Sequence, residues 1–339
     1  MYNVNKIFFI GNLDSNLFRI RLSVITYDSE LENYEVINTS RKKITNVIKF
    51  IFDSFKLFIH CLIYSETKII FHGAYNSILW LLVLINKNFV ISILQGSEIE
   101  KDYTKFRSFF VNLILKKSKL IVCRSQKQLS FVKNNINCEH SKVLIVYWGL
   151  SYKLFELNKK KSCKSINIIS PRASQNEYNI NIIFDAITRL KKQKYQVRFT
   201  YIKFNSKIKI KDIKVADKII DSPKQNQFWD ELINSDICIS IPDYDGFSNT
   251  ILESLALGNY VILSDLEPYT FIKKYCYLGK IIHLEDNYNK TVNSLYLTLM
   301  KTIKNIDDIR SNSNKRRTYI KNNYLNKKNF DFMLKIIKE

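Results

Sequence analysis

Glycine, proline and histidine are scarce in this sequence. Its 339 residues include 7 glycines, 4 prolines and 4 histidines, which excludes collagen-like and Gly/Pro-rich low-complexity chains. The 6 cysteines are widely spaced and form no C-x-x-C pair, and the histidines are equally scattered. The sequence therefore has neither zinc-ligand spacing nor a redox dithiol, and we expect no metal and no other cofactor.

Long apolar runs are also missing. The longest, residues 78–85, has eight residues, whereas about 18 are needed to span a bilayer. The apolar run within residues 1–10 is too short for a secretory signal. Apolar residues make up 46% of the chain and charged residues 25%, which is an ordinary globular composition, and the length suits two domains. We expect a cytoplasmic protein that is not integral to a membrane.

Positive charge is what the sequence has in excess. Lys and Arg number 53 against 31 Asp and Glu, which gives a net charge of +22. Such a field attracts nucleic acid, anionic lipid or phosphorylated substrates. Because 42 of the 53 basic residues are Lys, and Lys, Asn and Ile are all abundant, part of the excess reflects an AT-rich coding bias. The charge therefore permits an anionic partner but does not identify it.

Two basic, aromatic stretches favour a membrane surface as that partner. Residues 41–64 and 105–119 combine Lys with Phe at helical spacing, and helices of this kind bind anionic lipid. In the first stretch we expect an apolar stripe to pack on a sheet, with the Lys and Phe beside it forming a rim that faces the membrane. The stripe consists of Ile44, Val47, Ile48, Ile51, Phe55, Phe58, Ile59 and Leu62. The basic run at 315–317 has no nucleic-acid recognition motif, so we expect no nucleic-acid partner.

Short apolar runs alternate with helical segments along the whole chain. This order predicts an α/β fold with parallel sheets wrapped by helices. A basic stretch at 158–164 is typical of a linker, so we predict two Rossmann-like, doubly wound domains over residues 1–157 and 158–339. The strand-like runs are 6–10, 34–37, 68–72, 88–94, 119–123, 142–147, 165–169, 196–201, 236–241, 260–263 and 277–283.

Most of the few glycines follow such runs. Gly11, Gly73, Gly96 and Gly149 each lie within two residues of the end of an apolar run, where positive φ or close backbone approach favours glycine. Ligands of open α/β sheets bind at the carboxyl ends of the strands. We therefore expect the site in a cleft between the two domains, with His72 as a candidate lining residue.

The most informative stretch is 235–265, SDICISIPDYDGFSNTILESLALGNYVILSD. A buried strand is followed by a polar turn and then by a helix from about Ser248 to Leu257, which ends before Gly258. The first turn of this helix offers free N–H groups and the positive end of the helix dipole, which together suit a phosphate. Glu253, inside the helix, can accept both hydroxyls of a ribose, while Asp245 would face the group attached to the phosphate.

This stretch resembles the E-x7-E signature of the retaining GT-B glycosyltransferases of family 4, with Asp245 in place of the first Glu and Glu253 as the second. Residues 168–172 (IISPR) and 178–181 (YNIN) resemble the opening of that family's second domain. Residues 95–98 (QGSE) resemble its His-Gly-Ser-Asp segment, and 119–125 with 142–149 resemble the closing strands of its first domain. The likeness covers about residues 65–285.

The resemblance implies a GT-B fold, with an acceptor-binding first domain, a nucleotide-sugar-binding second domain and a last helix that crosses back to the first. Arg172, Asp245 and Glu253 would be catalytic: Glu253 would bind the donor ribose, Asp245 the donor sugar and Arg172 the diphosphate, whose growing charge it would stabilise. The implied donor-binding residues are Arg172, Gly246, Phe247, Ser248, Asn249, Thr250 and Glu253. Candidates for the acceptor or the cleft are Asn12, His72, Tyr75 and Gln95.

Three positions depart from the family pattern. Gly11 is followed by Asn12 rather than by a glycine-rich loop, Tyr178 stands where a Lys commonly assists the Arg, and Gln95 replaces a His. A metal-binding D-x-D reading of Asp243 and Asp245 is an alternative, since such a pair can hold a divalent ion on a diphosphate.

We therefore expect a retaining glycosyltransferase at the inner face of the cell membrane. It would move a sugar from a nucleotide diphosphate, UDP above all, onto a lipid-linked surface polysaccharide of the O-antigen, lipopolysaccharide or capsule type. The alternatives are a nucleotide-sugar 2-epimerase of the same architecture, which would need acid–base groups such as His72, and a non-catalytic basic scaffold that binds membrane or nucleic acid.

Overall fold

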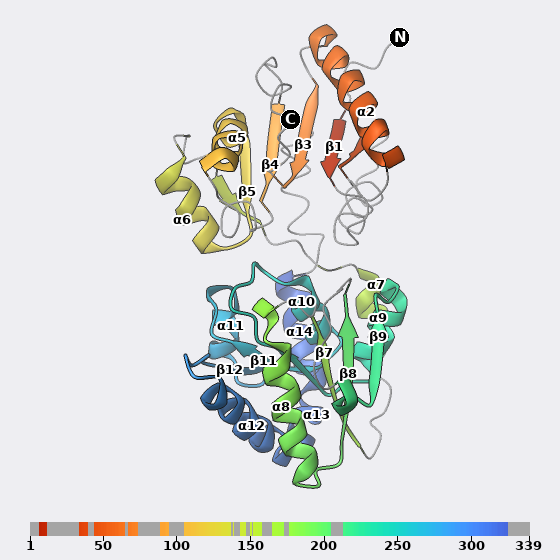
Figure 1. The fold of residues 1–339 in the computed structure, drawn as a ribbon, viewed down its shortest axis with the longest axis vertical. Helices are drawn as coiled ribbons and strands as arrows, with labels where there is room; N and C mark the ends of the chain where they lie inside the picture. Colours follow the sequence, from red (N-terminus) through yellow and green to blue (C-terminus); the bar gives the residue numbers. More distant parts are fainter. Residues whose placement is uncertain are drawn as a thin grey trace. The chain divides into compact units, whose positions relative to one another are not determined.

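The computed structural model of the chain contains two parallel sheets, each of six strands among the described residues (Figure 1). The structure describes residues 7–11, 34–39, 44–64, 67–73, 89–94, 105–136, 138, 143–146, 150, 152–157, 165–172, 176–204 and 213–324. The chain divides into two compact units between residues 148 and 149, and each unit holds one of the sheets.

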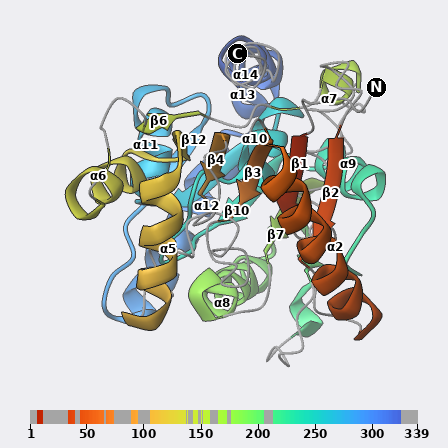
Figure 2. The same ribbon diagram turned by 90° about the horizontal axis from the view of Figure 1, so that it is seen from above.

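The first unit has the strand order β2-β1-β3-β4-β5-β6. Its strands are β1 (Ile7–Gly11), β2 (Tyr34–Asn38), β3 (Lys68–His72), β4 (Phe89–Ile93), β5 (Leu120–Cys123) and β6 (Val143–Ile145). Its helices are α2 (Ile44–Ile63), α5 (Lys105–Lys117) and α6 (Gln126–Asn135). One hydrophobic cluster joins alternate strand residues such as Phe8 and Ile10 to each of these described helices, so α2, α5 and α6 cover the same face of the sheet (Figure 2).

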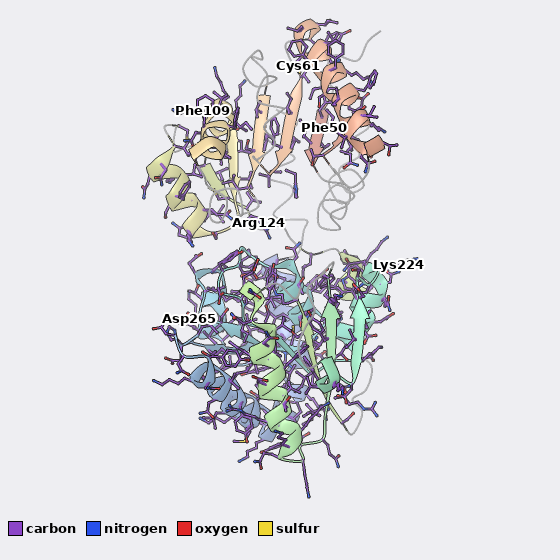
Figure 3. The ribbon with its side chains drawn as sticks, in the orientation of Figure 1. Phe50, Cys61, Phe109, Arg124, Lys224 and Asp265 are labelled. Atoms are coloured by element: carbon purple, nitrogen blue, oxygen red, sulfur yellow. The ribbon has the colours of Figure 1, made fainter. Side chains whose placement is uncertain are left out.

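The expectation that the apolar stripe of residues 44–62 packs on the sheet is wrong. The side of α2 that faces the sheet consists instead of Phe50, Ser54, Leu57 and Cys61, all of them buried, and among the described residues of the stripe Phe58 alone packs on this core. Figure 3 labels Phe50 and Cys61. Most of the predicted stripe is exposed, including Ile51 at 56%. The physical reason is that α2 is apolar around most of its circumference, so helical periodicity alone does not select the buried side.

The second unit has the strand order β12-β11-β10-β7-β8-β9. Its strands are β7 (Ile166–Pro171), β8 (Val197–Lys203), β9 (Lys218–Asp221), β10 (Ile237–Ser240), β11 (Tyr260–Ser264) and β12 (Gly279–Ile282). Its α-helices are α7 (Tyr152–Glu156), α8 (Ile180–Lys192), α9 (Gln225–Ile233), α10 (Asn249–Ala256), α11 (Thr270–Lys274), α12 (Tyr288–Lys304), α13 (Ile306–Ser311) and α14 (Ser313–Tyr324). Short 3-10 turns are η3 (Asn176–Tyr178), η4 (Ile213–Val215) and η5 (Glu267–Tyr269). In Figure 1, α8 and α12 lie in front of this sheet, with α10 and α14 behind it.

Helix α14 is fixed against α10 by a buried arginine and a close approach. Arg316, 1% exposed, donates hydrogen bonds to the carbonyls of Gly258 (3.0 Å), Tyr277 (2.9 Å) and Ile309. Gly258 has φ +88°, and a Cβ there would lie 2.0 Å from Ser313 Oγ. The basic run at 315–317 therefore includes a residue that holds the fold together.

The predicted α/β class is confirmed, and each of the eleven strand-like runs coincides with a strand. The sequence analysis missed β9, an edge strand in which only Ile220 is buried. The predicted boundary at 157/158 stays a prediction, as does the return of the last helix, which concerns residues after 324 that lie outside the described part. No helix among the described residues is long and apolar enough to cross a membrane.

Candidate active site

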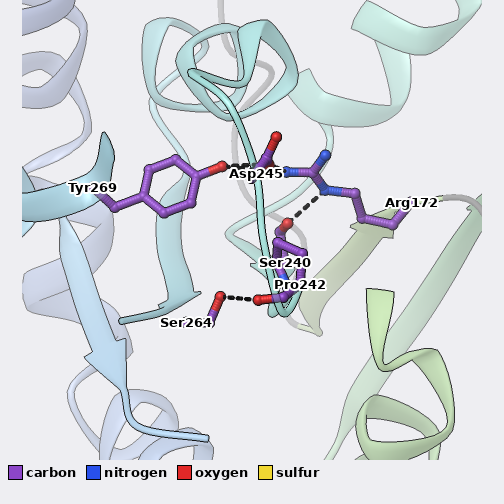
Figure 4. A network of polar contacts seen from close by, with 6 residues as sticks. All are labelled: Arg172, Ser240, Pro242, Asp245, Ser264 and Tyr269. Carbon is purple, nitrogen blue, oxygen red and sulfur yellow. Dashed lines mark hydrogen bonds and ion pairs between the residues drawn. The ribbon is translucent and has the colours of Figure 1, made fainter. Parts of the chain in front are cut away.

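A buried ion pair lies at the carboxyl edge of the second sheet. Arg172 follows the last residue of β7, and its Nη2 contacts Asp245 Oδ2 in the turn after the neighbouring strand β10 (Figure 4). Arg172 Nε also donates a 2.5 Å hydrogen bond to Ser240 Oγ, the last side chain of β10. Tyr269 completes the group by donating its hydroxyl to Asp245 Oδ2 at 2.5 Å. The cluster thus joins the end of β10 to the segments that follow β7, β10 and β11.

The charge of this cluster is well defined. Burial is the largest single influence and lowers the pKa of Arg172, which is 8% exposed. The charge and hydrogen bond of Asp245, together with Tyr269 and Tyr178, outweigh burial and raise the pKa above its ordinary value. Burial and the charge of Asp245 raise the pKa of Tyr269, so its hydroxyl remains a donor. The ring of Tyr178 lies 5.4 Å from the guanidinium carbon of Arg172, a cation–π distance. Tyr178, at the position where the sequence resemblance implies a Lys, therefore lies beside Arg172 with its ring.

A turn that precedes α8 holds the loop after β10 in place. Asn179, in the left-handed region at φ 53°, donates to the carbonyl of Ile241 (3.0 Å) and to Asp243 Oδ1 (2.6 Å). The carbonyl of Glu177 accepts from the N–H of Asp243 at 2.8 Å. These bonds hold residues 241 and 243 of the loop against the turn before α8, two positions ahead of Asp245.

Helix α10 begins directly after this loop. Ser248 is its N-cap, but the Ser248 side chain makes no capping hydrogen bond. The first intrahelical bond runs from the N–H of Leu252 to the carbonyl of Ser248 (3.3 Å), so the amides of Asn249, Thr250 and Ile251 have no intrahelical acceptor. The amide oxygen of Asn249 is buried without a hydrogen-bond partner among the described residues. Unpaired N–H groups at a helix N-terminus are suited to an anion.

Glu253 lies in the second turn of α10 and faces α9. Its Oε1 accepts hydrogen bonds from Trp229 Nε1 (3.0 Å) and Gln225 Nε2 (3.1 Å), and the residue is 9% exposed. Burial raises the pKa of Glu253 to about 7, although both hydrogen bonds oppose the shift. No described basic residue is paired with this carboxylate, so both protonation states are populated near neutral pH.

The structure brings Arg172 and Asp245 into contact, and residues 246–250 follow Asp245 directly in the chain, with Glu253 in helix α10. Phe247 enters the site only through its backbone, because its ring is 5% exposed and packs on Phe271 and Tyr324. His72 ends β3 of the first unit and is buried. The three other cleft candidates, Asn12, Tyr75 and Gln95, lie outside the described residues.

Sequence reasoning missed Tyr269, Trp229 and Gln225. Each makes its contact through tertiary structure, 24 to 28 positions from its partner in the chain. The two carboxylates of the D-x-D alternative are bonded to different partners, Asp243 to Asn179 and Asp245 to Arg172 and Tyr269. Among the described residues there is no cluster of three His, Cys, Asp or Glu side chains that could hold a metal.

Comparison with known proteins gives no match by sequence: no family model matches, and no curated protein does. Solved structures do match, over nearly the whole chain. HepE from Anabaena, in complex with UDP and glucose, superposes with a TM-score of 0.76 at 9% identity, covering 98% of this chain and 99% of HepE. A glycosyltransferase from Rickettsia africae gives 0.72 at 16% identity, covering 99% and 98%. Sucrose-phosphate synthase from Thermosynechococcus elongatus gives 0.71 at 10% identity, covering 98% of each chain.

The chain has the GT-B fold. Two parallel six-stranded sheets in separate units, matched over nearly full length by these structures, establish the fold that the sequence resemblance implied.

Proposed function

We propose that this protein is a retaining glycosyltransferase that moves a sugar from a nucleotide diphosphate, UDP in the first place, onto a lipid-linked surface polysaccharide at the inner face of the cell membrane. The observation that carries the proposal is the buried cluster of Arg172, Asp245 and Tyr269 beside the open N-terminus of α10. A guanidinium and free amides at one edge suit a diphosphate, and a carboxylate suits the hydroxyls of the attached sugar. The structures of HepE with UDP and glucose support the choice of donor.

In the proposed reaction, Glu253 holds the donor ribose. Both described bonds to this carboxylate end on Oε1, which leaves Oε2 for a ribose hydroxyl. Trp229 and Gln225 orient the carboxylate by donating to it from α9, and its ionised form is the one that accepts hydroxyl groups.

Arg172 acts on the leaving group. Its described contacts use Nε and Nη2, so Nη1 is available to a diphosphate oxygen as negative charge grows on the leaving nucleotide. Asp245, held through Oδ2 alone, presents Oδ1 to the hydroxyls of the transferred sugar. The first unit would bind the acceptor, with His72 and residues 12, 75 and 95 as candidate contacts.

Thermal protection tests the proposal without knowledge of the acceptor. A ligand at about 100 times its Kd adds roughly 2.7 kcal/mol, or several degrees in Tm. We expect one of UDP, GDP or their sugar derivatives to protect the wild type but not Glu253→Ala, while Asp307→Ala, which removes an exposed carboxylate on α13, keeps the protection. Absence of protection by every nucleotide would contradict the proposal and leave the non-catalytic scaffold as the better account.

A further inference from the structure

The outer face of α2 is apolar, and nothing in the proposed reaction uses it. We define this face by its exposed hydrophobic side chains, and two of its phenylalanines are 72% (Phe52) and 63% (Phe55) exposed. The face consists of Ile48, Ile51, Phe52, Phe55, Ile59, Leu62 and Ile63. A soluble chain rarely exposes so many large apolar groups side by side unless they bind something.

The charges around this face are positive. Residues 41–64 include five basic residues and one acidic residue, and Lys49 lies on the exposed side of α2. Helix α5 covers the same face of the sheet, so its outward side points the same way as that of α2 (Figure 2). There Phe109 is 63% exposed, and Lys116 and Lys117 are exposed at the end of the helix. Phenylalanines flanked by lysines thus recur on one side of the first unit.

We propose that the outer face of α2 inserts into the surface of an anionic lipid bilayer, with Lys49, Lys116 and Lys117 on the lipid headgroups. Charge decides between the available occupants, because a second copy of a chain with a net charge of +22 would be repelled, whereas anionic lipid is attracted. Contact with the sheet on one side and with lipid on the other would also explain why α2 has few polar positions. This inference extends the membrane part of the proposed function and does not depend on donor binding.

Vesicle flotation tests it with the full-length protein. We expect the wild type to float with phosphatidylglycerol vesicles, and binding to fall at least about tenfold when the combined variant Phe52→Ser, Phe55→Ser, Ile59→Ser is used. Because these side chains are exposed, the variant should fold, and a melting temperature equal to that of the wild type reports this. The matched control, Ile219→Ser with Leu297→Ser, removes exposed apolar groups from the second unit and should bind vesicles like the wild type.

A depth probe separates insertion from simple charge attraction. Phe52→Trp should be quenched by phosphatidylglycerol with brominated acyl chains, whereas Leu297→Trp should not. Flotation of the triple variant at the wild-type level would overturn the proposal. A second result would also overturn it: the wild type sediments as a dimer, the triple variant sediments as a monomer, and neither protein binds vesicles. The outer face of α2 would then contact a second copy of the chain.

Discussion

Strand β10 has a carboxylate–arginine pair at each end, and the two pairs are built differently. Asp236, just before the strand, is held through both oxygens: Arg310 Nε contacts Oδ1 and Nη2 contacts Oδ2, each at 3.0 Å. Oδ2 also accepts the N–H of Asn167 at 3.0 Å, and Arg310 donates further to the carbonyl of Ser165. This pair is satisfied by the protein, and it ties α13 to the sheet.

Asp245, after the strand, is held through one oxygen only. Arg172 and Tyr269 both contact Oδ2, and Figure 4 shows the other oxygen directed away from them. No described residue bonds that oxygen. The Asp245 side chain is 16% exposed, so this oxygen is open to a ligand. The comparison teaches that the first pair is completed within the fold, whereas the second keeps a free oxygen, as the proposed substrate contact requires.

The largest expected effect is on catalysis, at the end of β10 where we propose the site. Arg172→Gln should lower the rate of UDP release from the donor by about 10²–10³, because it removes the cation that stabilises the leaving group. The measurement is a coupled assay for UDP, with a membrane extract as the source of acceptor. Arg310→Gln should keep the wild-type rate at temperatures below its own Tm, and equal losses in both variants would remove the distinction between the two pairs.

The next largest effect is on stability, at the start of β10. Arg310→Gln should lower the free energy of unfolding by about 3 kcal/mol, because it leaves the buried carboxylate of Asp236 without its cation. Urea unfolding followed by circular dichroism measures this. If Arg310→Gln cost no more than an exposed pair, about 0.5 kcal/mol, the pair would not anchor α13 as described.

A third carboxylate, Glu253, differs from Asp236 and Asp245 because no basic residue among those described is paired with it. Its pKa is about 7 in the folded protein, so the ionised form that accepts ribose hydroxyls is a minority at pH 6 and the majority at pH 8. Affinity for a UDP-sugar should therefore rise about tenfold between these pH values. Calorimetric titration measures the change, and Glu253→Gln should abolish it.

The same shift predicts a dependence of stability on pH. The unfolded carboxyl titrates near 4.5 and the folded one near 7, so the folded state binds the extra proton between these values and stability falls as pH rises through them. Glu253→Gln should accordingly raise Tm at pH 8 more than at pH 5. If Glu253→Gln raised Tm at pH 5 but not at pH 8, the raised pKa of Glu253 would be contradicted.

The smallest effect is expected for Tyr269→Phe. Asp245 would lose one of its two donors but keep Arg172, so stability should change by about 1 kcal/mol and donor turnover by a few fold. Parallel melting and UDP-release measurements test this. A loss as large as that of Arg172→Gln would mean that the tyrosine hydroxyl takes part in the reaction itself.

Much of the fold could be predicted because parallel strands are buried on both faces and appear as short apolar runs. Strand β9 was not predicted because an edge strand needs few apolar residues, and Ile220 is the one buried residue of this strand. The buried side of α2 was predicted wrongly because the helix is apolar on both sides, and a periodic stripe cannot distinguish a sheet from another apolar surface. The helices and strands could be predicted from local sequence, whereas the surfaces on which they pack could be identified only in the structure.

The site divides in the same way. Arg172, Asp245 and Glu253 could be predicted because they stand at the ends of recognisable strands and in the helix between two of them. Tyr269 and Trp229 could not, since each reaches its carboxylate across a tertiary contact that leaves no local pattern. The ring contact between Tyr178 and Arg172 could not be predicted either, because the sequence resemblance implies a Lys at position 178.

The most direct test of the account compares Asp236→Asn with Asp245→Asn by calorimetric titration of UDP-glucose and UDP. We predict that Asp236→Asn lowers Tm yet binds both ligands like the wild type below that temperature. For Asp245→Asn we predict a loss of about tenfold in affinity for UDP-glucose, with UDP nearly unchanged, because only the sugar contact is removed. Loss of binding in Asp236→Asn, or unchanged binding of UDP-glucose in Asp245→Asn, would contradict the assignment of the substrate site to the carboxyl end of β10.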